Sequence, residues 1–201
     1  MSDDRLILRA IRREHTERRP LWIMRQAGRY LPEYRELRKT YSFKALSRSP
    51  ELATEVTLLP LKRYPLDAAI IFADIMSPLP ALGVEFDFDP GPVVENPLRD
   101  QAGVEALTLP DPDKLAPEVI EALQQARAQI PEETALLGFC GAPWTLAAYL
   151  VQGRGVKDFP ALRAFAAAQP QALNALLAKL SDAMATYLIN QARAGADAVQ
   201  I

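Results

Sequence analysis

The chain has 201 residues, of which 49% are hydrophobic and 24% are charged, as is ordinary for a soluble globular protein. No apolar run approaches the roughly 20 residues that a membrane-spanning helix needs, and the acidic first residues do not resemble a secretory signal. Cys140 is the only cysteine, which excludes a disulfide within the chain and fits a reducing compartment. We therefore expect a single domain over residues 1–201, located in the cytoplasm.

The net charge of −2 conceals an uneven distribution of basic and acidic residues. Residues 1–50 contain 13 of the 23 Lys and Arg residues and only 6 of the 25 Asp and Glu residues. A basic first segment on an acidic remainder favours an anionic ligand near that segment. Nucleic acid is not expected as a partner, because the remainder is too acidic for a continuous backbone-binding face.

The first segment predicts a helix, a strand and a loop. Asp3 or Asp4 can cap a helix that runs to about Glu14. The short apolar stretch from Leu21 to Met24 follows a proline and is typical of a buried strand. The polar residues 25–30 include a glycine and predict a loop after this strand.

Two further helices are expected before the second strand. Pro32 suits the first turn of a helix that continues through Leu37. Ser49 and Pro50 form a cap and a first helical position for the next helix. Pro60 should kink or end that helix, because proline lacks a backbone donor.

The middle of the chain predicts two more buried strands. Residues 67–73 are, after the first residue, a continuous apolar run that stops at Asp74, the pattern of a strand buried on both faces. Residues 84–98 alternate in polarity and predict a surface hairpin. Residues 111–129 predict a helix, and residues 135–139 predict a third buried strand.

The last third predicts two helices and the start of a fourth strand. One helix begins at Trp144, and the longest begins at Pro170 and terminates at Gly195. Residues 196–201 begin the fourth strand and echo residues 66–71, since both passages join a helix end to an apolar run through an aspartate. Such an echo is expected of repeated βα units.

Strands that are apolar on both faces and alternate with helices are typical of a parallel sheet flanked by helices. The chain stops at Ile201, inside the predicted fourth strand. We therefore expect an α/β chain that supplies about the first half of a (β/α)8 TIM-type barrel. In such barrels the active-site groups lie at the carboxyl ends of the strands.

That rule selects the candidate site residues. The first strand ends at Arg25, with Arg29 just beyond; the second ends at Asp74; the third ends at Phe139, with Tyr149 in the next helix. A closed barrel would bring these strand ends together. The predicted site therefore contains two guanidinium groups, a carboxylate, a phenol and apolar surface.

Each of these residues has a structural alternative. Arg25 and Arg29 could be solvated loop arginines, and Asp74 could merely cap a turn. Tyr149 could be a core residue whose hydroxyl finds a backbone partner. Cys140 is expected to be a small buried filler, because a reactive thiol needs a basic neighbour.

Three segments resemble the uroporphyrinogen decarboxylase family: residues 19–35, 63–74 and 138–153. The first contains Arg-Gln-Ala-Gly-Arg at positions 25–29, and the second contains the apolar run that ends at Asp74. The sequence departs from the pattern at Ala73, where many relatives carry serine. The resemblance covers essentially the whole chain.

The resemblance implies the removal of four acetate carboxyl groups from uroporphyrinogen III, giving coproporphyrinogen III in haem biosynthesis. It assigns substrate carboxylates to Arg25 and Arg29, pyrrole N–H groups to Asp74, and the reacting acetate to Tyr149. Arg25 is also a candidate proton donor, beside bound water or a substrate carboxyl group. Further residues are expected to contact substrate: Gln26, Ala27, Gly28 and Phe139.

The same resemblance implies that no cofactor is needed, because the pyrrole ring itself accepts the electrons left by carbon dioxide. It also implies a homodimer. A metal is not expected, because His15 and Cys140 are the only residues of their types and do not suffice for a conventional zinc site.

Two rival hypotheses remain open at this point. A methyltransferase of the same superfamily would carry a His/Cys metal cluster downstream of Ile201. A half barrel could instead be a non-catalytic remnant, since it exposes unpaired strand edges. The family's serine after the fourth strand and its C-terminal histidine both lie outside these 201 residues.

Overall fold

The computed structural model describes residues 5–88 and 91–201. The chain divides into two compact units, and each is described by itself. The first unit takes in the chain up to Asp74 together with residues 117–139 and 190–200. The second takes in residues 75–116, 140–189 and 201. The prediction of a single domain stays a prediction.

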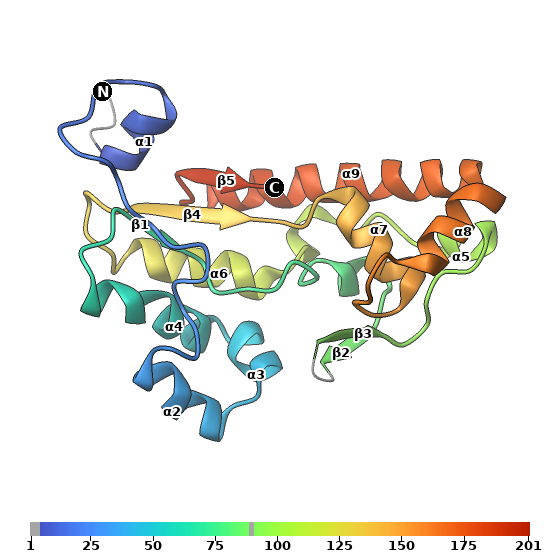
Figure 1. Cartoon of the computed structure of the whole chain (residues 1–201), viewed down its shortest axis with the longest axis horizontal. Helices are drawn as coiled ribbons and strands as arrows, with labels where there is room; N and C mark the ends of the chain where they lie inside the picture. Colours follow the sequence, from blue (N-terminus) through green and yellow to red (C-terminus); the bar gives the residue numbers. More distant parts are fainter. Residues whose placement is uncertain (1–4, 89–90) are drawn as a thin grey trace. The chain divides into compact units, whose positions relative to one another are not determined.

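The first unit is built on a parallel sheet of β1, β4 and β5, in the order β1-β4-β5. Figure 1 shows these strands beside the helices of the unit. Ala68 pairs with Ala135, and Leu137 pairs with Ala198. Its strands are β1 (Ala68–Ile70), β4 (Ala135–Phe139) and β5 (Ala198–Gln200). Its helices are α1 (Leu6–Ile11), α2 (Pro32–Thr40), α3 (Phe43–Arg48), α4 (Pro50–Arg63) and α6 (Pro117–Arg127).

Serine caps begin two of these helices. The side chain of Ser42 accepts a hydrogen bond from Ala45 N and caps α3. Ser49 accepts one from Leu52 N and caps α4, with Pro50 at the first helical position as predicted. Helix α4 then continues to Arg63, so of the two expected effects of Pro60 the ending of the helix is wrong, and the kink stays a prediction. Pro60 is buried, and the packing of α4 offsets the backbone bond that this residue cannot make.

The two echoing passages form the same pair of hydrogen bonds. Asp67 N donates to Leu21 O at 2.9 Å, and the Asp67 carboxylate accepts from Leu21 N at 2.6 Å. Asp197 N likewise donates to Leu136 O at 2.8 Å, and its carboxylate accepts from Leu136 N at 2.7 Å. Each aspartate therefore fixes the strand that begins with it against the neighbouring segment.

The segment Leu21–Met24 is not a strand, so that prediction is wrong. Leu21 is 56% exposed and Met24 is 72% exposed, and Trp22 packs against the cluster of the sheet. A strand requires a ladder of backbone hydrogen bonds to a neighbour. Leu21 makes its two bonds to Asp67, one of them to the side chain, and these do not amount to a ladder.

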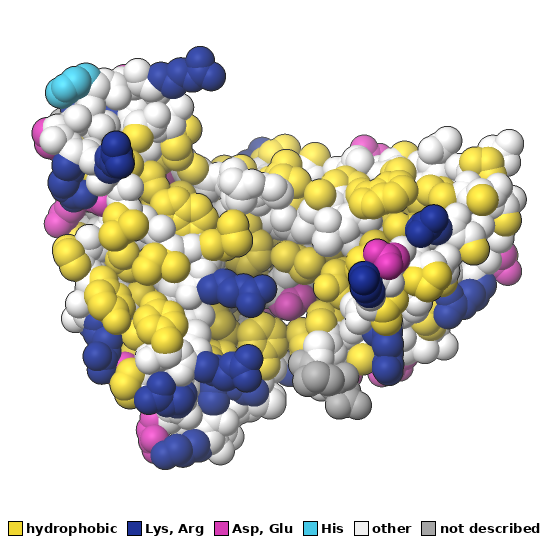
Figure 2. Space-filling model, viewed as in Figure 1, with side chains coloured by type: hydrophobic (Ala, Val, Ile, Leu, Met, Phe, Trp, Pro, Cys, Tyr) yellow, Lys and Arg dark blue, Asp and Glu magenta, His cyan; other side chains and the backbone are white. Residues whose placement is uncertain are grey.

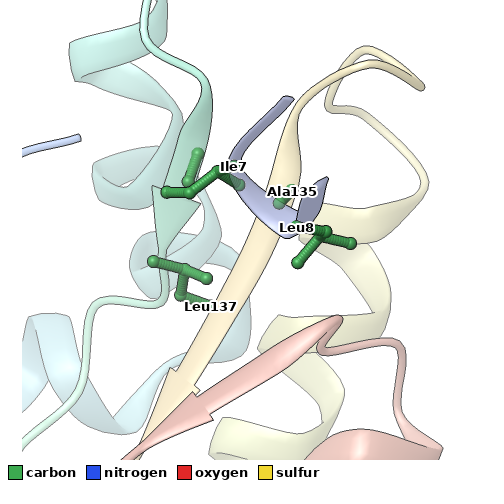
Figure 3. Close-up of a cluster of buried hydrophobic side chains, with 5 residues drawn as sticks. Ile7, Leu8, Ala135 and Leu137 are labelled. Carbon is green, nitrogen blue, oxygen red and sulfur yellow. The ribbon is translucent and has the colours of Figure 1, made fainter. Parts of the chain in front are cut away.

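Two clusters of apolar side chains in the described residues contribute to the core of this unit. Ile7 and Leu8 of α1 pack against Ala68, Ala135 and Leu137 of the sheet, as Figure 3 shows for the labelled residues. The second cluster joins α2, α3 and α4, with these members: Leu31, Tyr34, Leu46, Val56 and Leu59. The expected caps Asp3 and Asp4 lie outside the described residues, and the helix ends at Ile11 rather than near Glu14. Ile11, the last residue of α1, is 60% exposed.

The second unit contains the predicted hairpin. Strands β2 (Phe86–Phe88) and β3 (Pro92–Val94) pair antiparallel, with Phe86 opposite Val94. Val94 N donates to Gly153 O at 2.7 Å, which ties the hairpin to the end of helix α7 (Pro143–Gln152). Phe86 and Val94 are buried, so the hairpin is less superficial than expected.

Helices make up the rest of the second unit, and the longest of them continues into the first. They are α5 (Gln101–Ala106), α7 (Pro143–Gln152), α8 (Pro160–Ala168) and α9 (Pro170–Arg193), with short 3-10 turns at Leu79–Leu82 and Pro112–Lys114. Gly195 adopts a φ of 108°, the left-handed conformation expected after α9. Residues 111–129 do not form one helix, because a 3-10 turn precedes α6.

Candidate active site

Residues 25–29 form a compact loop that presents two arginines. Arg25 and Arg29 are exposed, whereas Gln26 between them is only 1% exposed. Gln26 Oε1 accepts a hydrogen bond from Ile23 N at 2.9 Å, and Gln26 O accepts one from the Tyr30 hydroxyl. The loop therefore folds around a buried glutamine and directs its charged residues to the surface.

The end of the loop is fixed to α2. Leu31 N donates to Gly28 O at 2.9 Å, and Arg35 donates to Arg29 O at 2.9 Å and to Tyr30 O at 3.3 Å. Ala27 packs against the cluster around Leu31. The intervening loop therefore has hydrogen bonds on both sides of Gln26, which restrict how far the guanidinium groups can move relative to one another.

This loop lies close to the end of β1. The ring of Tyr34 meets the ring of Phe72 edge-on, with centroids 5.8 Å apart, and Phe72 stands two residues before Asp74. Burial raises the pKa of Tyr34, while the positive charges of Arg38 and Arg29 oppose that rise. The charge of Arg29 therefore lowers the pKa of Tyr34, and the ring of Tyr34 contacts the segment that carries Asp74.

Side chains replace the regular ladder where β1 ends. The ladder between β1 and β4 closes at Ile70 opposite Leu137. Phe72 N then donates at 2.9 Å to Thr57 Oγ1, a hydroxyl on α4 that itself donates to Ala53 O. Beyond this point Asp74, which is half-buried, ends the first of the three stretches of chain that make up this unit.

The side chain of Gln191 forms hydrogen bonds with the backbone at the end of β4. Its Oε1 accepts from Phe139 N at 2.9 Å, and its Nε2 donates to Phe139 O at 2.8 Å. The Gln191 side chain is fully buried, and a Cβ on Gly138 would collide with it. A side-chain amide from α9 thus fixes the main chain of Phe139 at a carboxyl end of the parallel sheet.

Tyr149 belongs to the second unit, where it is half-buried on α7. Its ring meets Phe159 edge-on at 6.0 Å, and the loop around Gly155 passes beside its hydroxyl. Cys140 in the same unit is buried, and burial raises the pKa of its thiol to about 11. The expectation that Cys140 is a buried filler is therefore confirmed.

The structure places the other predicted residues in the first unit. Asp74 follows β1 and Phe139 ends the neighbouring parallel strand β4, and the loop of Arg25 and Arg29 reaches the end of β1 through Tyr34. In the view of Figure 2, Lys and Arg side chains gather over α2 and α3. The basic character of the first segment thus includes surface arginines as well as the two loop arginines.

Sequence reasoning missed two residues that fix this region, Thr57 and Gln191. Both are buried polar side chains on the apolar faces of helices. Gln191 continues the buried positions Leu180, Met184 and Tyr187 of α9 at helical spacing, and a polar residue at such a position needs a partner. That signal was present in the sequence.

In residues 5–88 and 91–201, no cluster of three or more His, Cys, Asp or Glu side chains could hold a metal ion. Nor is any helix of the described chain long and apolar enough to cross a membrane.

Comparison with known proteins identifies the class and then the family. A methyltransferase from Methanosarcina mazei shares the fold, with a TM-score of 0.78 at 21% identity over 96% of this chain and 56% of that one. This likeness confirms the predicted class, an α/β chain that supplies about half of a (β/α)8 barrel. Residues 2–201 match the family described as uroporphyrinogen decarboxylase (URO-D), and the chain belongs to that family.

Two relatives illustrate the relationship. The uroporphyrinogen decarboxylase of Alkalilimnicola ehrlichii is 47% identical over 204 residues, which cover all of this chain and 56% of that protein. That of Dichelobacter nodosus is 48% identical, again over all of this chain and 59% of the relative. The chain thus spans a little over half the length of the curated relatives it matches.

Proposed function

We propose that the full protein decarboxylates the four acetate side chains of uroporphyrinogen III and releases coproporphyrinogen III. One observation carries this proposal: a loop with two exposed arginines is held, through Tyr34 and Phe72, beside the strand that leads to Asp74. Family membership supports the same reaction class. The substrate has eight carboxylates and four pyrrole N–H groups, so its binding site needs cations for the carboxylates and a carboxylate for the N–H groups.

The loop would hold the substrate by its acidic side chains. Arg25 and Arg29 carry planar, permanently charged guanidinium groups that suit carboxylates. Gln26 braces the loop, and its buried Nε2 makes no hydrogen bond within the described residues. Because a buried donor without a partner costs about 1–3 kcal/mol, we infer that substrate or water satisfies this group in the complete site. Ala27 and Gly28 bring the backbone close to the bound ligand.

Asp74 would stabilise the cation that drives the reaction. Protonation of a pyrrole carbon gives a cation that accepts the electron pair when the bond to carbon dioxide breaks, so no cofactor is required. A carboxylate facing the pyrrole N–H groups stabilises that cation more than it stabilises the ground state. Tyr149 would lie beside the reacting acetate, and Phe139 would supply apolar surface.

Three groups are candidates for the proton donor. Arg25 is one candidate, but an arginine is a poor acid unless its surroundings strongly disfavour its charge. A bound water or a substrate carboxyl group can deliver the proton without that cost. The proposal therefore assigns stabilisation to Asp74 and leaves the acid among these three groups.

We also propose that the full protein is a homodimer in the cytoplasm. The single buried thiol of Cys140 fits a reducing compartment. Sedimentation equilibrium of the full protein would test the dimer, which predicts twice the monomer mass.

The direct test is product formation by the full protein, extended beyond Ile201. Incubation with uroporphyrinogen III should give coproporphyrinogen III through intermediates with seven, six and five carboxylates. Transfer of a methyl group with no loss of carbon dioxide would overturn the proposal in favour of the methyltransferase rival. Activity of the 201-residue chain equal to that of the full protein would overturn the expectation that the remaining part is needed.

A loop variant and a matched control test the proposed binding residues. Arg29→Gln should raise the KM about tenfold or more, because it removes a charge-assisted bond to substrate. Arg38→Gln removes an arginine from the neighbouring helix, where Arg38 donates to Tyr41 O. The control should leave the KM within about twofold, and an equal change in both variants would mean that only general surface charge matters.

A further inference from the structure

We propose that Asp67 and Arg18 are positioning residues for the substrate-binding loop, an inference that rests on the decarboxylase function proposed above. Asp67 lies at the start of β1, and Asp74 follows the end of that strand. Asp67 precedes the strand and Asp74 follows it, seven residues later, so Asp67 lies at the end of β1 away from the proposed reacting groups. Its action on the site must therefore pass through the segment it holds.

The contacts of Asp67 are unusually complete for a residue at a strand entrance. Its side chain is 9% exposed and accepts from both terminal nitrogens of Arg18, at 2.8 and 2.5 Å. One of the same two oxygens accepts the Leu21 amide at 2.6 Å, and Asp67 N donates back to Leu21 O at 2.9 Å. A two-pronged arginine pair and a two-bond backbone link together fix the position of Leu21.

The segment after Leu21 depends on this link because it has little packing of its own. Leu21, Ile23 and Met24 are between 42% and 72% exposed. Only Trp22 packs against the sheet cluster. Hydrogen bonds therefore fix the position of this segment. In a buried strand, the packing of apolar side chains would fix it instead.

A shift at Leu21 would be passed on to the arginines. Ile23 N is bonded to Gln26 Oε1, and Tyr30 is bonded to Gln26 O, so residues 23–30 form one hydrogen-bonded loop. Arg25 follows Leu21 by only four residues. The entrance of this loop is held by Asp67, and its exit is held by Leu31 and α2. Release of the entrance would leave the guanidinium groups anchored from one side only.

The chain contains a matched control for this proposal. Asp197 makes the same two bonds to Leu136 and also pairs with Arg127 and Arg5. Leu136, however, lies in β4 between two strands and is fully buried. The Asp197 link therefore supports a strand that is already fixed by its neighbours and carries no part of the arginine loop.

The experiment compares Asp67→Asn with Asp197→Asn in the full protein. Asparagine keeps one acceptor oxygen but places an amide against the arginine, so both variants lose the ion pair and keep the side-chain size. Asp67→Asn should raise the KM for uroporphyrinogen III about tenfold and change the kcat less than threefold. Asp197→Asn should lower the melting temperature to a similar degree and leave the KM within twofold.

Equal changes in KM for the two variants, or an unchanged KM in Asp67→Asn, would overturn the proposal. Arg18→Lys should give a KM between those of the parent and Asp67→Asn, because lysine keeps the positive charge but cannot form the bidentate pair. Hydrogen exchange at the Leu21 and Ile23 amides provides a readout that does not depend on turnover. If the parent protein releases no carbon dioxide, the proposed function fails, while faster exchange in Asp67→Asn than in Asp197→Asn would still support the anchoring role.

Discussion

The segment Leu21–Met24 and strand β4 carry similar apolar side chains in opposite surroundings. Strand β4 lies between β1 and β5, and Leu136 at its centre is fully buried. Leu21 makes two hydrogen bonds to Asp67 and is 56% exposed. The difference shows that an apolar run becomes a strand through its neighbours, and that a segment with one neighbour depends on polar contacts.

Within the candidate site, the end of β4 and the arginine loop are held in different ways. The buried side-chain amide of Gln191 fixes the end of β4, a strand that its two neighbours in the sheet already hold in place. The arginine loop follows the weakly packed segment and is fixed mainly by hydrogen bonds. The two loop arginines thus lie on a part of the first unit whose position depends on single polar contacts.

The largest expected contrast concerns stability. Leu136→Ala should lower the free energy of unfolding of this chain by about 2–5 kcal/mol, because it opens a cavity in the sheet core. Leu21→Ala should cost less than about 1 kcal/mol, since the side chain is largely exposed. Urea unfolding curves measure both values, and equal losses would show that Leu21 is packed as tightly as β4.

A buried thiol and an exposed thiol should differ in their rates of alkylation. Burial raises the pKa of Cys140 to about 11, so at pH 8 it should react with iodoacetamide about a hundredfold more slowly than an ordinary thiol. A thiol introduced by Met24→Cys, at a 72% exposed position, should react at nearly the ordinary rate. Similar rates at the two positions would contradict the assigned burial.

Gln191→Glu should cost about 1–3 kcal/mol of stability. An ionised carboxylate can still accept from Phe139 N, but it cannot donate to Phe139 O and repels it. Gln129→Glu, at an exposed position in the turn after α6, is the matched control and should change stability by less than about 0.5 kcal/mol. Substrate turnover measured beside stability would show whether Phe139 also needs this support for function.

The smallest expected effect is on pH dependence. Burial alone would raise the pKa of Asp67, but the hydrogen bonds from Arg18 and Leu21 N outweigh it, so this pKa lies below its ordinary value. Asp67 therefore contributes stability above its unfolded pKa of about 4 and loses it as the pH falls through the lower folded value. The stability difference between parent and Asp67→Asn should shrink below about pH 4, and a difference that grows there would contradict the assignment.

Local patterns allowed much of the fold to be predicted. The Ser49 cap, the β4 run and the Gly195 termination each depend on a few adjacent residues, and each is confirmed. The exposed state of Leu21–Met24 could not be predicted, because it depends on which strands lie alongside it. The continuation of α4 through Pro60 depends on packing around the helix, which is equally invisible in a local pattern.

The candidate site shows the same division. Arg25, Arg29 and Asp74 were selected because they follow apolar runs, and their catalytic and binding roles stay predictions. The contact between Tyr34 and Phe72 joins residues 38 positions apart and follows no sequence period. The echo between residues 66–71 and 196–201 was visible, but the arginine partners of its two aspartates were not.

The turnover of Asp74→Asn in the full protein tests the central claim most directly. Asparagine keeps the size of the side chain and removes the charge that would stabilise the pyrrole cation. We predict that the variant keeps the circular dichroism spectrum of the parent and forms coproporphyrinogen III slower by orders of magnitude. Product formation near the parent rate would contradict the role of Asp74 and the mechanism built on it.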